Sequence, residues 1–330
     1  MSNMVRRAFV TLLGGAAIWP HAVLAEKRDE VRRIGVIMGF AEDDEVWQTY
    51  LATFRQALQE LGWTDGRNIR FDYRFTRDSE QQMRNMAEDI VALSPDVILA
   101  STNSVVSATL NATRSIPIVF TWVSDPVGSG FVTNLPHPGG KITGFHNFEP
   151  AIGGKWLAYL SQIAPAIRHV AVMHVPEIAP NVAFLRVVEA VAPQMGITVT
   201  AADIRNAVDI ERVVSAFGQQ GGGLIVTPSA LTATRRDLII SLAARFGLPA
   251  IYSFGFYTAS GGLISYGINQ LEQARPAASY VDQILRGANP GDLPIQLPLK
   301  YELVINLKTA AGLGLTVPNS LQLLADQVIE

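Results

Sequence analysis

Short apolar runs alternate along this chain with longer stretches in which apolar residues recur every three or four positions. The first pair is a buried run at residues 34–38 and an amphipathic stretch at 47–61, with Gly62 ending the predicted helix. The same order of run and stretch returns many times. This rhythm predicts repeated βα units around parallel sheets, and hence an α/β fold.

The first series of units predicts one lobe. Its strands are expected at residues 34–38, 69–75, 97–100 and 118–120, and its helices at 47–61, at 79–93 and from Ser104 onward. Between Pro126 and Gly144 the periodicity stops and turn-forming Gly and Pro accumulate. We therefore expect the first crossing to a second lobe just beyond Gly144.

The second series of units predicts the other lobe. Its strands are expected at residues 170–174, 197–200, 224–226 and 250–252, and its helices at 154–163, 182–195, 210–217 and 235–246. A strand at 263–266 and a helix at 274–286 are expected to return to the first sheet, and 301–307 to cross back. Three crossings predict a hinge between lobe 1 (31–145 plus 262–290) and lobe 2 (146–261 plus 291–330).

The first 25 residues are typical of an export signal. Arg6 and Arg7 precede an apolar stretch at 8–18, and small residues occupy Val23 and Ala25, the positions that a signal peptidase inspects. No later stretch has the roughly 20 apolar residues that a membrane span needs. The sequence thus predicts a soluble periplasmic protein, exported by the twin-arginine or the general secretion route, both of which stay open.

Composition narrows the classes of partner and site. The chain has no cysteine, so it cannot form disulfides, thiolate metal sites or a cysteine-linked lipid anchor. Without the first 25 residues, 24 of the 26 basic residues remain against 29 acidic ones, a net charge of −5. A nucleic-acid partner is not expected at this charge, and we expect a freely diffusing monomer.

Seven motifs follow one another in a characteristic order. They are RIGV at 33–36, DVILA at 96–100, IPIVF at 116–120, SDPVGSG at 124–130, PGGKITG at 138–144, GGLISYG at 261–267 and LVINLKTA at 303–310. Together they closely resemble the ABC-transporter substrate-binding proteins that include tryptophan- and tyrosine-binding members. The resemblance implies the type I periplasmic binding protein fold, with two Rossmann-like lobes and a three-crossing hinge. It also implies a small ligand such as an aromatic amino acid, an ABC permease in the inner membrane as partner, and no cofactor.

In open parallel sheets, ligands bind outside the carboxyl ends of the strands, where helix N-termini favour anions. The most informative loop is the polar run that follows the strand at 97–100. Thr102, Asn103 and Ser104 could hold a ligand carboxylate through side-chain and backbone donors. The alternative is that they only cap the helix.

Other loops at the same edge supply further candidates. Asp125 could pair with a ligand ammonium group, or it could organise the Asp-Pro turn. Ser124 and Ser229 lie in candidate loops of the two lobes. The rings of Phe40, Trp122 and Phe254 could enclose a flat ligand, with core packing as the alternative. Phe256 and Tyr257, and the cations Arg74 and Lys155, are weaker candidates.

Enzyme and metal signatures are scarce in the sequence. It has no Gly-x-Ser-x-Gly elbow and no phosphate-binding Gly-rich loop, and its histidines lack paired helical spacing. We therefore predict a binding protein with no catalytic residue and no metal site. Two alternatives stay open: a ligand sensor whose partner is a receptor or kinase, and a periplasmic enzyme on the same scaffold.

Overall fold

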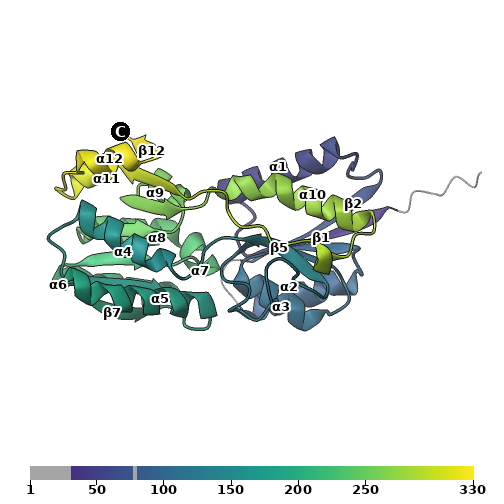
Figure 1. Cartoon of the computed structure of the whole chain (residues 1–330), viewed down its shortest axis with the longest axis horizontal. Coiled ribbons are helices and arrows are strands. Elements are labelled where there is room, and N and C mark those ends of the chain that lie inside the picture. The colour runs from purple at the N-terminus through teal and green to yellow at the C-terminus, as the bar shows by residue number, and fades with distance from the viewer. Residues whose placement is uncertain (1–30, 77–79) are drawn as a thin grey trace, which may run out of the picture. The chain divides into compact units, whose positions relative to one another are not determined.

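The computed structural model describes residues 31–76 and 80–330 of the chain. The predicted export signal at 1–25 lies outside the described residues. Within residues 31–330 the chain forms two α/β lobes, each built on its own sheet (Figure 1). This confirms the predicted fold class.

The first lobe is built on a parallel sheet with the strand order β2-β1-β3-β4-β5. Its strands are β1 (Arg32–Met38), β2 (Ile69–Phe75), β3 (Val97–Ser101), β4 (Ile118–Val123) and β5 (Ile142–His146). Its helices are α1 (Glu45–Glu60), α2 (Glu80–Ala92), α3 (Asn103–Ala112) and α10 (Ala274–Leu285). The central strands β3 and β4 are buried along their whole length, as expected where helices cover both faces of a sheet.

The second lobe is built on a sheet with the order β12-β11-β10-β9-β8-β6-β7. Its strands are β6 (His169–His174), β7 (Thr198–Asp203), β8 (Gly223–Val226), β9 (Ala250–Tyr252), β10 (Ile264–Gly267), β11 (Glu302–Asn306) and β12 (Gln327–Ile329). Its helices are α4 (Ile152–Ile163), α5 (Ala179–Val191), α6 (Ala207–Gln220), α7 (Ala230–Thr234), α8 (Arg236–Arg245), α9 (Gly255–Ala259), α11 (Leu307–Gly312) and α12 (Asn319–Leu324). Single 3-10 turns lie at Ala192–Met195, Gln270–Gln273 and Pro290–Asp292.

One predicted strand belongs to the other sheet. The run at 263–266, expected in the first sheet, is β10, which pairs in parallel with β9 and antiparallel with β11 in the second sheet. A buried apolar run predicts a strand without specifying its sheet. The chain crosses to the first lobe only after Gly267, and α10 then packs on α1. The other lobe boundaries remain predictions.

Three crossings connect the lobes, after β5, after β10 and before β11, and hydrogen bonds hold them side by side. The Gln273 amide donates to Asn147 Oδ1 at 2.9 Å, and the Tyr301 hydroxyl donates to the Asn147 carbonyl at 3.1 Å. The rings of Phe148 and Tyr301 stack at 5.8 Å. The hinge is therefore a small packed assembly.

Candidate functional site

Two contiguous cavities lie between the lobes at the carboxyl ends of the strands. An inner cavity has a volume of about 20 Å³ and an outer cleft one of about 830 Å³. They share residues of both lobes: Asn103, Ser104, Ile178, Ser229 and Ala230. A ligand entering through the cleft would therefore reach the inner cavity directly.

The structure brings most of the predicted site residues together. Those that line the inner cavity are Phe40, Thr102, Asn103, Ser104, Trp122, Ser124, Ser229 and Phe254. They come from the ends of β1, β3, β4, β8 and β9, so the strand-end rule located them. Ligand contact by these residues stays a prediction, because the structure shows where they lie and not what they bind.

Asp125 is the predicted residue that lies outside both cavity linings. Its carboxylate Oδ1 accepts a hydrogen bond from the Gly128 backbone N–H at 2.9 Å, and its φ of 40° places it in a turn. A Cβ atom at position 128 would lie 2.1 Å from the other carboxylate oxygen, so only glycine leaves room for this contact. The structure thus favours the turn interpretation of Asp125 over pairing with an ammonium group.

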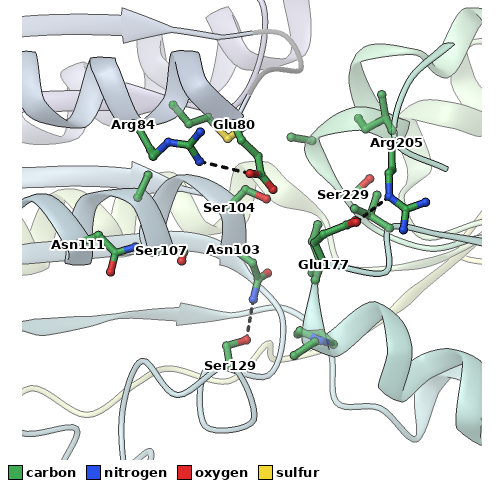
Figure 2. Close-up of a pocket in the computed structure, with 18 of the residues that line it drawn as sticks. Glu80, Arg84, Asn103, Ser104, Ser107, Asn111, Ser129, Glu177, Arg205 and Ser229 are labelled. Atoms are coloured by element: carbon green, nitrogen blue, oxygen red, sulfur yellow. Dashed lines mark hydrogen bonds and ion pairs between the residues drawn. The ribbon is translucent and has the colours of Figure 1, made fainter. Parts of the chain in front are cut away.

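Asn103 uses its side chain to hold a neighbouring loop. Its amide nitrogen donates to Ser129 Oγ at 3.0 Å (Figure 2). The same nitrogen donates to the Ser124 carbonyl at 2.7 Å, and the amide oxygen accepts from the Ser124 N–H at 3.0 Å. Both ends of the amide are occupied. The side chain of Asn103 is therefore not available to a ligand, and Asn103 contributes to the cavity as the first residue of α3.

The N-terminus of α3 opens onto the cavities without a side-chain cap. Thr102 is the N-cap residue, but it makes no cap hydrogen bond, and its buried Oγ1 has no partner among the described residues. Its φ of 73° is unusual for a β-branched residue. Simple capping by Thr102 is therefore not observed, and the helix end keeps the free N–H groups and the dipole field that attract anions.

Ser229 does act as a helix cap. Its hydroxyl accepts from the Thr232 N–H at 3.0 Å, and the Thr232 hydroxyl accepts from the Ser229 N–H at 3.1 Å, which makes a reciprocal capping box for α7. The hydroxyl lines both cavities while it performs this structural role. The capping alternative proposed for the run at 102–104 is thus not observed at Thr102, whereas Ser229 caps its own helix.

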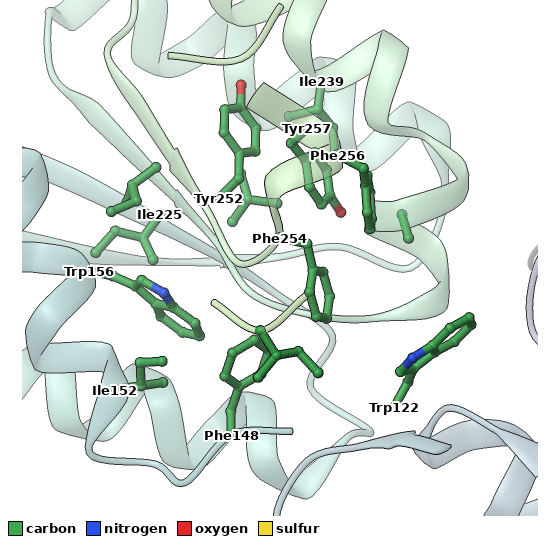
Figure 3. Packing of buried hydrophobic residues seen from close by; sticks show 14 of the residues in the cluster. Trp122, Phe148, Ile152, Trp156, Ile225, Ile239, Tyr252, Phe254, Phe256 and Tyr257 are labelled. Carbon is green, nitrogen blue, oxygen red and sulfur yellow. The ribbon is translucent and has the colours of Figure 1, made fainter. Parts of the chain in front are cut away.

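Aromatic rings form one wall of the inner cavity. Trp47 stacks on Phe40 with ring centroids 3.8 Å apart and lies 3.6 Å from Trp122 at a tilt of 50°. Phe254 stacks on Phe256 at 5.5 Å in the second lobe, and Figure 3 shows Phe254 between Phe148 and the pair Phe256 and Tyr257. The wall therefore combines rings of both lobes.

Trp47 was missed as a site residue in the sequence. The periodic pattern placed it only at the start of the helix predicted at 47–61; in the structure Trp47 is 2 % exposed. The signal that could have identified it is its position in the first turn of α1, a few residues after the loop that follows β1. Phe256 and Tyr257 pack nearby without lining either cavity.

Two ion pairs face each other across the outer cleft. Arg84 and Glu80 on α2 of the first lobe are 3.3 Å apart, and Arg205 and Glu177 of the second lobe are 2.6 Å apart (Figure 2). The hydrogen bond that the Arg205 guanidinium donates to the Glu177 carboxylate is the main reason that the pKa of Arg205 is raised. The charges of the cleft therefore balance within each lobe. None of these four residues was among the predicted site residues.

A third ion pair joins the two lobes directly. The Asp44 carboxylate accepts from the Val46 N–H at 3.1 Å, which caps α1, and also pairs with Arg236 of α8. The side chains of Asp44 and Arg236 are only 8 % and 17 % exposed. The Arg236 guanidinium lies 5.7 Å from the centre of the Phe256 ring, and that ring lies 5.8 Å from Trp47. Charge and aromatic contacts thus connect the lobes beside the inner cavity.

Metal ligation and membrane spanning can be assessed for the part of the chain that the structure describes. Residues 31–76 and 80–330 contain no group of three or more His, Asp or Glu side chains that could hold a metal ion. No helix in that part of the chain is long and apolar enough to cross a membrane.

Comparison with known proteins gives the family. The family of ABC transporter substrate binding proteins matches residues 34–329. A tyrosine-binding protein of Clostridioides difficile is 24 % identical over 79 % of this chain and 75 % of its own length. A conserved domain protein of Vibrio cholerae is 25 % identical with a TM-score of 0.83, covering 91 % of this chain and 100 % of its own. An ABC domain from Streptococcus pneumoniae in complex with L-Trp has a TM-score of 0.83 at 22 % identity, over 90 % and 99 % of the two chains. The chain belongs to the family of ABC transporter substrate-binding proteins.

Proposed function

We propose that this protein is the periplasmic solute-binding component of an ABC importer and captures a small aromatic ligand with a carboxylate between its lobes. The observation that carries the proposal is the inner cavity. It joins an aromatic wall to the uncapped N-terminus of α3, and both lobes contribute to its lining. A flat apolar group and an anionic group are the two features that such a cavity can recognise.

Aromatic amino acids are one class of candidate for the ligand. The similar proteins named for tyrosine and crystallised with L-Trp support this class. In this chain the rings of Trp47, Trp122 and Phe254 would contact the ligand ring. The α3 N-terminus with Thr102 and Ser104 would receive the carboxylate.

Closure of the lobes would couple binding to transport. Because both lobes line the cavity, a ligand that contacts both stabilises the closed arrangement by its differential affinity. The closed, loaded monomer would then dock on an inner-membrane permease, which could distinguish it from the empty protein. Export by the N-terminal signal would place the protein on the side of the membrane where it meets its ligand.

The first test identifies what the protein carries. Small molecules released by denaturing the purified mature protein are identified by mass spectrometry, and the same compound is then added back in a thermal-shift assay. A ligand at 100 times its Kd should stabilise the fold by about 2.7 kcal/mol. We expect an intact aromatic carboxylate that raises the Tm. Recovery of a chemically altered product would favour an enzyme, and a ligand without a ring would contradict the proposed ligand class.

A pair of variants ties the result to the cavity. Trp47→Leu removes a ring of the inner wall, whereas Trp63→Leu changes a tryptophan that lines neither cavity. We expect the first to weaken binding at least tenfold and the second to leave the Kd unchanged. Equal losses in both variants would mean that binding depends on general stability and not on the inner cavity.

A further inference from the structure

We propose that the ligand is an aromatic carboxylate without an ammonium group, such as an arylpropionate, and that α-amino acids bind more weakly. This inference rests on the proposed function and narrows its ligand class. Its starting point is the charge of the inner cavity. Among the described residues that line this cavity there is no Asp, Glu, Lys or Arg.

The carboxylates in the loops around the cavity already have partners. Asp44 pairs with Arg236, and Asp125 accepts from the Gly128 N–H. Glu177, at the cleft, lies 2.6 Å from Arg205. A ligand ammonium buried here would lack a counter-charge unless one of these contacts broke, and burying an unpaired charge is strongly unfavourable.

The field of the nearby helices opposes an ammonium and favours an anion. The 10-residue α3 and the 13-residue α5 both begin at the cavities, and neither has a side-chain cap hydrogen bond at its N-cap residue, Thr102 and Ile178. Each N-terminus carries about half a positive charge. Only α3 adds several N–H groups without a partner, because in α5 Pro180 has no N–H and the Asn181 N–H donates to the Ile178 carbonyl at 2.8 Å. A carboxylate is stabilised at such a place, and a cation is repelled.

Buried polar atoms without a partner give an independent indication that the ligand supplies hydrogen-bond acceptors. The indole N–H groups of Trp47 and Trp122 and the Thr102 Oγ1 are buried, and no described residue forms a hydrogen bond with them. All three residues line the inner cavity and are at most 6 % exposed. An indole N–H can only donate, so the missing partner must be an acceptor. A carboxylate provides acceptors, whereas an ammonium provides none.

The size of the cavity predicts how the ligand enters. A volume of about 20 Å³ is close to the space of one water molecule, so a ligand ring fits only if the cavity walls move apart. The rings of Trp47 and Trp122, whose centroids lie 3.6 Å apart, are part of that wall. Separation of the two rings would also expose both buried indole N–H groups to the ligand. Binding should therefore change the intrinsic tryptophan fluorescence.

The test compares three probes that differ only at the two polar groups: 3-(indol-3-yl)propionate, L-tryptophan and tryptamine. Each is titrated by calorimetry and by fluorescence into protein freed of bound molecules by unfolding and refolding. We expect the propionate to bind at least tenfold tighter than tryptophan, and tryptamine not to bind. Tryptophan binding as tightly as the propionate would overturn the inference and leave the proposed function intact. Binding by none of the three would overturn the inference, and the recovered molecule would then show whether the proposed ligand class also fails.

A charge variant examines the anion site itself. Ser104→Asp places a carboxylate in the first turn of α3, where the helix field favours it and where it would compete with the ligand carboxylate. Ser241→Asp adds the same charge at an exposed position of α8 outside both cavities. We expect Ser104→Asp to weaken the propionate at least tenfold and to allow tryptamine to bind, with the Tm unchanged, while Ser241→Asp binds as wild type. Unchanged propionate affinity in Ser104→Asp would overturn the proposal.

Discussion

At the scale of single residues, the backbone of the site is held in an unusual conformation. Thr102 and Trp122 have φ angles of 73° and 57°, and both line the inner cavity. Such conformations cost about 1–3 kcal/mol each and persist only where the surroundings enforce them. At Trp122 the backbone N–H donates to Gln273 Oε1 at 3.1 Å, which connects this strained residue to the second crossing of the hinge.

The sequence could predict which residues lie at the site but not how they are used. Strand-end loops are visible as polar runs after apolar ones, and this located Thr102, Asn103 and Ser229. It could not show that Asn103 is occupied by Ser124 while Thr102 is left without a partner, because hydrogen bonds between distant segments have no local signal. Trp47 was missed for the related reason that its helical position conceals a tertiary contact.

The ion pair between the lobes gives a prediction for one residue. Asp44→Asn keeps an excellent N-cap for α1 but removes the charge that pairs with Arg236. Since the pair is largely buried and can form only when the lobes are close, its loss should weaken ligand binding by roughly tenfold or more. Calorimetry gives the Kd, and small-angle scattering with and without ligand reports closure.

A second ion pair within the first lobe serves as the control. Glu60 and Arg275 are 2.6 Å apart, but both side chains are about half exposed. Glu60→Gln should change the Kd by less than about twofold, because exposed pairs contribute little. If Glu60→Gln and Asp44→Asn weakened binding equally, the pair between the lobes would have no special part in closure.

At the scale of elements, the sequence predicted most strands and helices of both lobes, because βα units carry a strong periodic signal. The prediction that the strand at 263–266 joins the first sheet was wrong for a physical reason. Its partner β11 runs antiparallel and lies about 40 residues away along the chain, and no local pattern records such a pairing. The short β12, with partly exposed residues, gave no apolar run to detect.

Close packing at the end of β10 can be tested by one added methyl group. A Cβ atom at Gly267 would lie 1.8 Å from the Ser253 carbonyl oxygen, a backbone atom that cannot simply rotate away. Gly267→Ala should therefore destabilise the protein by about 1–3 kcal/mol, seen as a lower midpoint in urea.

The matched change is Gly312→Ala in α11, where nothing lies within 4 Å of the added atom. It should be neutral or stabilise by about 0.4–1 kcal/mol. A wild-type midpoint for Gly267→Ala would mean that β9 and β10 can separate freely at this point.

At the scale of the whole molecule, the hinge contains a buried histidine. His146 ends β5, and its Nε2 lies 2.8 Å from the Phe148 carbonyl oxygen at the first crossing. Burial lowers the pKa of His146 below its ordinary value of 6.5, while the Phe148 carbonyl and the carboxylates of Glu149 and Asp125 oppose the shift. The folded protein therefore disfavours the protonated ring.

This direction fixes the pH dependence of stability. Below pH 6.5 the unfolded chain binds a proton that the folded chain resists, so the contribution of His146 is present above pH 6.5 and is lost as the pH falls. The Tm, measured from pH 7.5 to 5.5, should fall less in His146→Gln than in wild type. The same substitution at the exposed His137 should leave the slope unchanged; identical slopes in all three proteins would exclude His146 as a source of acid sensitivity.

The late placement of α10 and β11 along the chain affects how the protein can be made. During synthesis, every strand of the first sheet emerges early, yet the helix that packs on α1 follows only at 274–285. The second sheet likewise waits for 302–306 before β10 gains its second neighbour. A growing chain therefore keeps both lobes incomplete for most of translation. Both lobes can therefore complete their folding only when nearly the whole sequence is present.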